Sequence, residues 1–223
     1  MSRTSISAGV PELPSPAIRR IGSKPIGASW WMAAAFLIAL GLTLAVLGRF
    51  GAGEDGTALA LRVTARWCFL LFWPAYAGGA AAKLFGSRFF GLFPALARHG
   101  RAFGLAFASA LLVHIGLVLW LLYVAADQRS PMIFFWVGVA ATGALALFSL
   151  PRFRELLGPR LWRIGCTLAL EYIALVFAVD FIVEPLHASG AHAYPLTYLP
   201  FAVTLLAGTA LRLTAFAQRA AKP

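Results

Sequence analysis

The sequence is poor in charged residues, and poorest in acidic ones. Only 12% of its 223 residues are charged, with 8 Asp and Glu against 19 Lys and Arg, while 61% are hydrophobic. Soluble domains carry about 25% charged residues, so this composition excludes an ordinary soluble domain. The chain also lacks a Gly-rich dinucleotide fingerprint, a P-loop and a Cys-x-x-Cys pair. A flavin or nicotinamide would therefore have to be held by a partner chain.

Long apolar runs make up most of the chain instead. A helix needs about 20 mostly apolar residues to cross the roughly 30 Å hydrocarbon layer of a bilayer. Six stretches fit this pattern: 29–48, 67–82, 102–124, 132–150, 162–183 and 196–216. We therefore predict an all-α integral membrane protein, a six-transmembrane-helix bundle at 28–217 that lies in the lipid bilayer. Tails are predicted at 1–27 and 218–223, the first being polar, flexible and without the apolar core of a secretory signal.

The basic residues are distributed unevenly around these spans. Fifteen of the 19 fall on one side: Arg3, Arg19, Arg20, Lys24, Lys83, Arg88, Arg98, Arg101, Arg152, Arg154, Arg160, Arg163, Arg212, Arg219 and Lys222. Four fall on the other: Arg49, Arg62, Arg66 and Arg129. Because Lys and Arg favour cytoplasmic loops, both termini are predicted to be cytoplasmic, and no nucleic-acid partner is expected. On this topology Cys68 and Cys166 lie near opposite faces, too far apart for a disulfide.

A histidine, His114, lies inside the third span. At ~1.5 Å per residue it is roughly 20 Å from Arg101 at the start of that span. Ala110 and Ala106 lie four and eight residues before it, on its own helix face, and leave a slot beside the imidazole. That slot could hold the edge of a flat macrocycle or a neighbouring helix. The imidazole needs a partner there, whether a hydrogen-bonding side chain, water or a metal.

Three segments resemble a known family. "RAFGLAFASALLVH" (101–114) resembles the third helix of the ferric reductase-like transmembrane domain family, and is closest to the haem-binding membrane subunit of the bacterial methionine sulfoxide reductase system. "TARWCFLLFWPAY" (64–76) resembles that family's second helix, and "LALFSLPRFRELLGPRLWRIG" (145–165) its fourth-to-fifth connection. The resemblance implies a bundle in the bacterial inner membrane with His114 as an axial ligand of haem b. It also implies electron transport, as the membrane component of an oxidoreductase with a separate redox partner protein.

The fifth helix departs from the family pattern. The family places histidine ligands about four residues after the Trp and about a dozen residues later, where this chain has Cys166 and, near the second position, Asp180. The resemblance therefore implies at most one haem, with an unusual or open sixth position. Two other functions stay open. One is a haem-less relative acting as a structural or partner-binding membrane subunit, and the other is a small proton-coupled transporter using Glu171, Asp180 and His114.

Two acids lie inside the fifth span, where carboxylates usually face the bundle interior or water. Glu171 lies about a third of the way in, and is expected either to be protonated or to pair with a basic group at the cytoplasmic edge. Asp180 lies near the outer end of its span. Since His114 also lies in the outer half, a His–Asp hydrogen bond between the third and fifth helices is the alternative to haem ligation.

The other three histidines lie outside the predicted spans. His99 is in "ARHGR" (97–101), which we expect to be a solvated cytoplasmic loop. His187 and His192 are in "EPLHASGAHAYP" (184–195), beside Glu184 at the outer mouth of the bundle. Two histidines at this spacing are common in loops, so they indicate a metal site only weakly.

Overall fold

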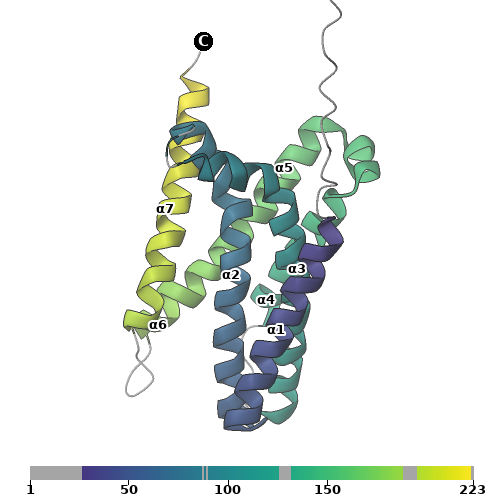
Figure 1. The fold of residues 1–223 in the computed structure, drawn as a ribbon, viewed down its shortest axis with the longest axis vertical. Helices are drawn as coiled ribbons and strands as arrows, with labels where there is room; N and C mark the ends of the chain where they lie inside the picture. The colour runs from purple at the N-terminus through teal and green to yellow at the C-terminus, as the bar shows by residue number, and fades with distance from the viewer. Residues whose placement is uncertain (1–26, 87, 89, 126–131, 188–194, 222–223) are drawn as a thin grey trace, which may run out of the picture.

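The computed structural model describes residues 27–86, 88, 90–125, 132–187 and 195–221, and these residues form helices and turns without any strand. The elements in chain order are α1 (Ala28–Phe50), α2 (Glu54–Phe85), α3 (Leu92–Val124), α4 (Met132–Phe148), α5 (Pro151–Ala178), the π-helix η1 (Val179–Val183), α6 (Glu184–His187) and α7 (Pro195–Ala220). Figure 1 shows α1, α2 and α3 side by side, with α7 on the other side of α2 and α5 crossing the bundle diagonally.

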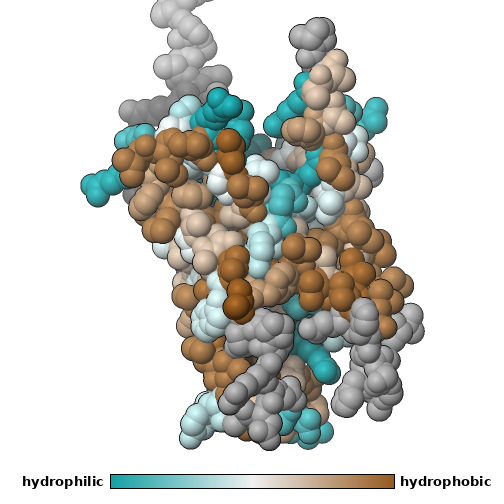
Figure 2. All heavy atoms as spheres, turned by 180° about the vertical axis from the view of Figure 1, so that it is seen from behind, coloured by the Kyte–Doolittle hydropathy of each residue, from teal (hydrophilic) through white to brown (hydrophobic). Residues whose placement is uncertain are grey.

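Helices with the length and composition of membrane spans account for most of the described chain. Five qualify outright: Ser29–Phe50, Glu54–Phe85, Leu92–Val124, Glu155–Val183 and Thr197–Ala220. The remaining apolar helix, Ile133–Phe148, is shorter. All six coincide with the predicted spans, so the all-helical, membrane-type fold is confirmed. Large apolar side chains such as Leu44, Leu112 and Leu206 point outward, and Figure 2 shows apolar residues over much of one face.

Three helices extend well beyond their predicted spans, and one of them is α5, which begins at Pro151 rather than at residue 162. The second was predicted from residue 67 and the third from residue 102, but α2 begins at Glu54 and α3 at Leu92. Hydropathy marks only the apolar part of a helix, whereas the arginines that precede it are themselves good helix formers. His99 therefore lies on α3, which corrects its prediction as a loop residue. Its side chain is exposed, as expected, and its ring lies 6.4 Å from that of Trp31.

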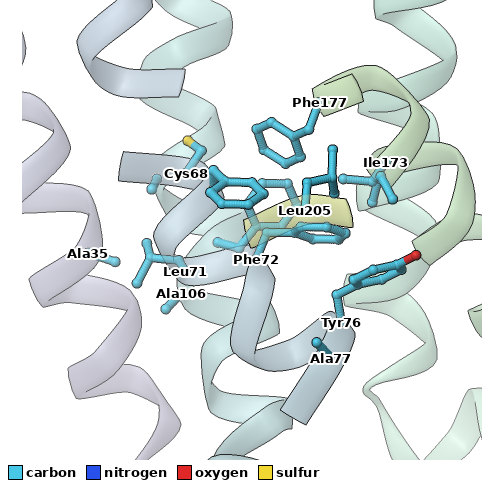
Figure 3. Packing of buried hydrophobic residues seen from close by; sticks show 14 of the residues in the cluster. Ala35, Cys68, Leu71, Phe72, Tyr76, Ala77, Ala106, Ile173, Phe177 and Leu205 are labelled. Atoms are coloured by element: carbon cyan, nitrogen blue, oxygen red, sulfur yellow. The ribbon is translucent and has the colours of Figure 1, made fainter. Parts of the chain in front are cut away.

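The buried core is centred on α2. Aromatic side chains of this helix, Phe69, Phe72 and Tyr76, are almost completely buried. The Phe72 ring stacks on Tyr76 at 5.2 Å and lies 5.3 Å from Phe177 of α5. Figure 3 shows this cluster closed by Leu205 of α7 on another side. Because α2 contacts α1, α3 and α7 as well as this part of α5, polar groups on α2 can reach partners on several helices.

We call one end of the bundle the basic end. It is the end at which α2 and α7 finish and α3 begins, and it carries Lys83, Arg98, Arg101 and Arg219. The ammonium group of Lys83 donates a 3.0 Å hydrogen bond to the Ala215 carbonyl, which joins α2 to α7 there. In Figure 1, α5 lies close to α7 at the opposite end and diverges from it towards the basic end.

Candidate functional site

The partner of His114 is a threonine on α2. Nδ1 of His114 lies 2.9 Å from Oγ1 of Thr64, a side chain with no exposed surface. The same Oγ1 lies 2.9 Å from the carbonyl oxygen of Ala60. A hydroxyl has one hydrogen, so both contacts are hydrogen bonds only when Nδ1–H donates to Thr64 and Thr64 donates to Ala60. The imidazole thus joins α3 to α2, with its lone pair on Nε2.

Neighbouring helices fill the slot beside His114. Ala106 and Ala110 have no exposed surface and belong to the core. On the same helix, the Ser109 hydroxyl donates a 2.9 Å hydrogen bond to the Met32 carbonyl of α1. Of the two predicted occupants of the slot, the structure therefore shows a packed helix.

The hydrogen bond that the structure gives His114 goes to Thr64 and not to Asp180, whose pairing with His114 stays a prediction. Within the described residues, the side chain of His114 contacts Thr64 on α2 and the ring of Phe135 on α4, at 6.4 Å between centroids. Asp180 lies in η1 and is partly buried. Sequence reasoning missed Thr64 because a threonine in a helix usually bonds its own backbone, and so gives no sign of a distant partner.

Glu171 is the centre of a polar cluster that joins three helices. Arg212 of α7 donates a 2.8 Å hydrogen bond from Nε to Oε1 of Glu171, and its Nη2 lies 2.6 Å from the same oxygen as an ion pair. The Tyr76 hydroxyl of α2 donates to Oε2 at 2.9 Å. Arg212 also donates to the Tyr76 carbonyl at 3.0 Å and lies 4.5 Å from the centroid of its ring. We call Tyr76, Glu171 and Arg212 the clamp.

The clamp confirms one of the two alternatives predicted for Glu171, namely pairing with a basic group. Both carboxylate oxygens are hydrogen-bonded, as an ion pair in a membrane protein requires. The side chain of Glu171 is nevertheless 46% exposed on the protein surface, and that of Arg212 is 21% exposed. The cluster therefore holds α5 against α2 and α7 at a place where these helices begin to diverge.

The clamp and the His114 bond occupy different levels of the bundle. Thr64 and Tyr76 are twelve residues apart on α2, which separates them by roughly 18 Å along the helix axis. Glu171 and His114 are attached to α2 at these two points. Glu171 and His114 are therefore not brought together into one site.

A cavity of about 800 Å³ lies between α2 and α3 on one side and α4 and α5 on the other, towards the basic end. Pockets of about 300 to 1,000 Å³ commonly hold small ligands and cofactors. Aromatic and aliphatic side chains, including Phe72, Phe107 and Leu170, form much of its wall. The polar and charged residues that line it are Arg101, Thr142, Ser149, Glu155, Trp162 and Cys166.

Sequence reasoning did not find this cavity, since four helices contribute to it. One signal was present: Trp162, Cys166 and Leu170 recur every four residues and form one stripe on α5. Cys166 is a free thiol, partly buried, and Cys68 is free and buried. Both cysteines are unpaired, as predicted. His114 does not line the cavity; the nearest lining residue on α3 is Phe107, seven residues or roughly 10 Å away along the axis.

The predicted metal pair of the outer loop is not tested. His192 lies outside the described residues, and His187 is the last residue of α6. Among the residues that are described, no three His, Cys, Asp or Glu side chains are grouped so that they could hold a metal ion.

Comparison with known proteins yields no match: no family model, no curated protein and no solved structure is similar to this chain.

Proposed function

We propose that this chain is a structural or partner-binding membrane subunit, a haem-less protein of the ferric reductase-like type. The observation that carries the proposal is the hydrogen bond between His114 and Thr64, together with the complete burial of Ala106 and Ala110 beside it. These contacts give the intramembrane imidazole a role in holding α3 to α2. The distribution of basic residues supports six spans with both termini in the cytoplasm, and the resemblance supports a bacterial inner membrane.

The packing around His114 favours a structural role over that of an axial ligand to a haem. The slot that would take the macrocycle is filled by packed helices, and the cavity of suitable size lies roughly 10 Å closer to the basic end. Transport by Glu171, Asp180 and His114 gains no support either. Both oxygens of Glu171 are hydrogen-bonded within the clamp, at a different level of α2 from His114.

A second candidate function, electron transfer through a single haem b, is favoured by one observation. Cys166 has the position at which the related family has a histidine ligand, and it lines the cavity. A thiolate ligates haem iron in some proteins, and Arg101 could pair with a haem carboxylate. The haem would supply one-electron transfer, and a separate donor or catalytic chain would be needed for oxidoreductase activity.

The visible spectrum of the detergent-purified protein, expressed with added haem, tests both candidates. The variants His114→Ala and Cys166→Ala are compared with wild type, oxidised and then reduced with dithionite. The exposed histidine variant His99→Ala is the matched control. We expect a colourless protein whose thermal stability falls in His114→Ala and not in His99→Ala.

If the wild-type protein has a haem absorbance band, the variant that loses this band decides which proposal is kept. A Soret band that shifts on reduction and disappears in Cys166→Ala would favour the electron-transfer candidate. A Soret band that disappears in His114→Ala, while the variant keeps its stability, would overturn the structural role of the imidazole.

A further inference from the structure

The cavity beside α5 carries two opposite charges at its lining. Arg101 comes from the first part of α3 and Glu155 from the first turns of α5, so both lie towards the basic end. Both side chains are exposed. In the part of the chain that the structure describes, neither has an ion-pair partner, and they do not pair with each other. The cavity therefore offers one guanidinium and one carboxylate, each free to bind a ligand.

The remainder of the cavity is suited to hydrocarbon. Phe72, Phe107 and Leu170 form walls that reach towards the middle of the bundle. The diagonal path of α5 explains the space, because this helix meets α2 through Phe177 and diverges from it towards the basic end. A water-soluble ligand that bound only the two charges would leave these walls uncovered, at a cost proportional to their apolar area.

We propose that this cavity binds an amine-bearing zwitterionic phospholipid from the leaflet at the basic end. The phosphate would pair with Arg101, since guanidinium groups form strong charge-assisted hydrogen bonds with phosphate oxygens. The primary ammonium would donate hydrogen bonds to Glu155. The first part of an acyl chain would cover the walls formed by Phe107 and Leu170. This proposal goes beyond the structural role proposed above and does not depend on it.

Other membrane lipids match the two charges less well. A lipid with an anionic, amine-free headgroup would satisfy Arg101 through its phosphate but has no ammonium to compensate the charge of Glu155. A choline headgroup has the right charges but no N–H with which to donate a hydrogen bond to the carboxylate. The carboxylate is therefore the group that selects the primary amine, and the guanidinium is the group that binds any phospholipid.

The test measures lipid binding to the full chain, delipidated in mild detergent, by native mass spectrometry with phosphatidylethanolamine, phosphatidylcholine and phosphatidylglycerol of the same acyl chains. We expect one saturable site, at which phosphatidylethanolamine binds about tenfold more tightly than the other two lipids, the effect of one charge-assisted hydrogen bond. Glu155→Gln should abolish the preference over phosphatidylcholine. Arg101→Gln should weaken binding of both lipids.

Two control variants remove the same charges elsewhere. Arg160→Gln changes an exposed arginine on α5 that does not line the cavity, and Asp55→Asn changes an acid at the start of α2. Both should bind lipid like wild type. Thermal unfolding without lipid shows whether each variant is folded, and Glu155→Asp, which keeps the carboxylate, should keep the preference for the amine.

Four results would overturn the proposal. Equal binding of the three lipids would show that the cavity does not distinguish between headgroups. Tighter binding of phosphatidylglycerol would identify a site for anionic lipid. Binding that is unchanged in both Arg101→Gln and Glu155→Gln would assign the lipid to the general protein surface. A haem whose absorbance depends on Cys166 would assign the cavity to a cofactor instead.

Discussion

Replacement of Arg212 by methionine should destabilise the protein strongly. The change removes one hydrogen bond and an ion pair to Oε1 of Glu171 and one hydrogen bond to the carbonyl of Tyr76, and it leaves the carboxylate without a cation. Breaking a buried ion pair by removing one partner costs about 3 to 5 kcal/mol. Breaking an exposed pair costs only about 0.2 to 1 kcal/mol, and because Glu171 is 46% exposed we expect an intermediate loss of about 2 kcal/mol.

A double-mutant cycle separates the loss of the pair from the cost of an uncompensated charge. Removing both charges, with Glu171→Gln and Arg212→Met together, should be less destabilising than Arg212→Met alone, since no unpaired carboxylate remains. The assay is reversible unfolding of the purified protein in mixed micelles, followed by circular dichroism. Arg219→Met, a change of an exposed arginine in the last turn of the same helix, should have little effect. If the two single changes simply add in the double variant, the two groups are not coupled and the role of the clamp is refuted.

Three further predictions concern packing and the cysteines. Thr64→Val should lower stability by about 1 to 3 kcal/mol in the same unfolding assay, because it leaves the buried imidazole N–H without an acceptor; an unchanged midpoint would contradict the role of this bond. Gly208→Ala should destabilise the protein by about 1 to 3 kcal/mol, because the new Cβ would lie 2.8 Å from the indole nitrogen of Trp73 on α2. In the control Gly41→Ala, the new Cβ has nothing within 4 Å, so this change should be neutral or stabilising. A small thiol reagent should modify the partly buried Cys166 and spare the buried Cys68 in the folded protein, so mass spectrometry should find one adduct in wild type, and none in Cys166→Ala.

The helices could be predicted from the sequence because a span is a local property. Length and apolar composition within one segment decide whether it can cross a bilayer, and all six predicted segments are helical. The extra length of α2, α3 and α5 escaped prediction because the added turns contain polar and charged residues, and hydropathy does not distinguish a polar helix from a loop. For the same reason His99, which lies in a polar stretch, was predicted in a loop but lies on α3.

The contacts between helices could be predicted only in part. The sequence indicated that Glu171 needs a partner, but Arg212 is 41 residues away, and its choice depends on how α5 and α7 are rotated and tilted. The partner of His114 is 50 residues away and is a residue type without charge. The cavity depends on the divergence of α5 from α2, which is a property of the assembled bundle.

The difference in length between α3 and α4 has a consequence for the surrounding bilayer. The 17 residues of α4 extend about 26 Å, whereas the 33 residues of α3 extend about 50 Å. A hydrocarbon layer of roughly 30 Å differs from both lengths if the described helices stand upright, a mismatch that thinner lipid beside α4 and a tilt of α3 would relieve. The protein should therefore concentrate in thinner regions of a membrane, and lipids that tolerate local compression should gather around α4.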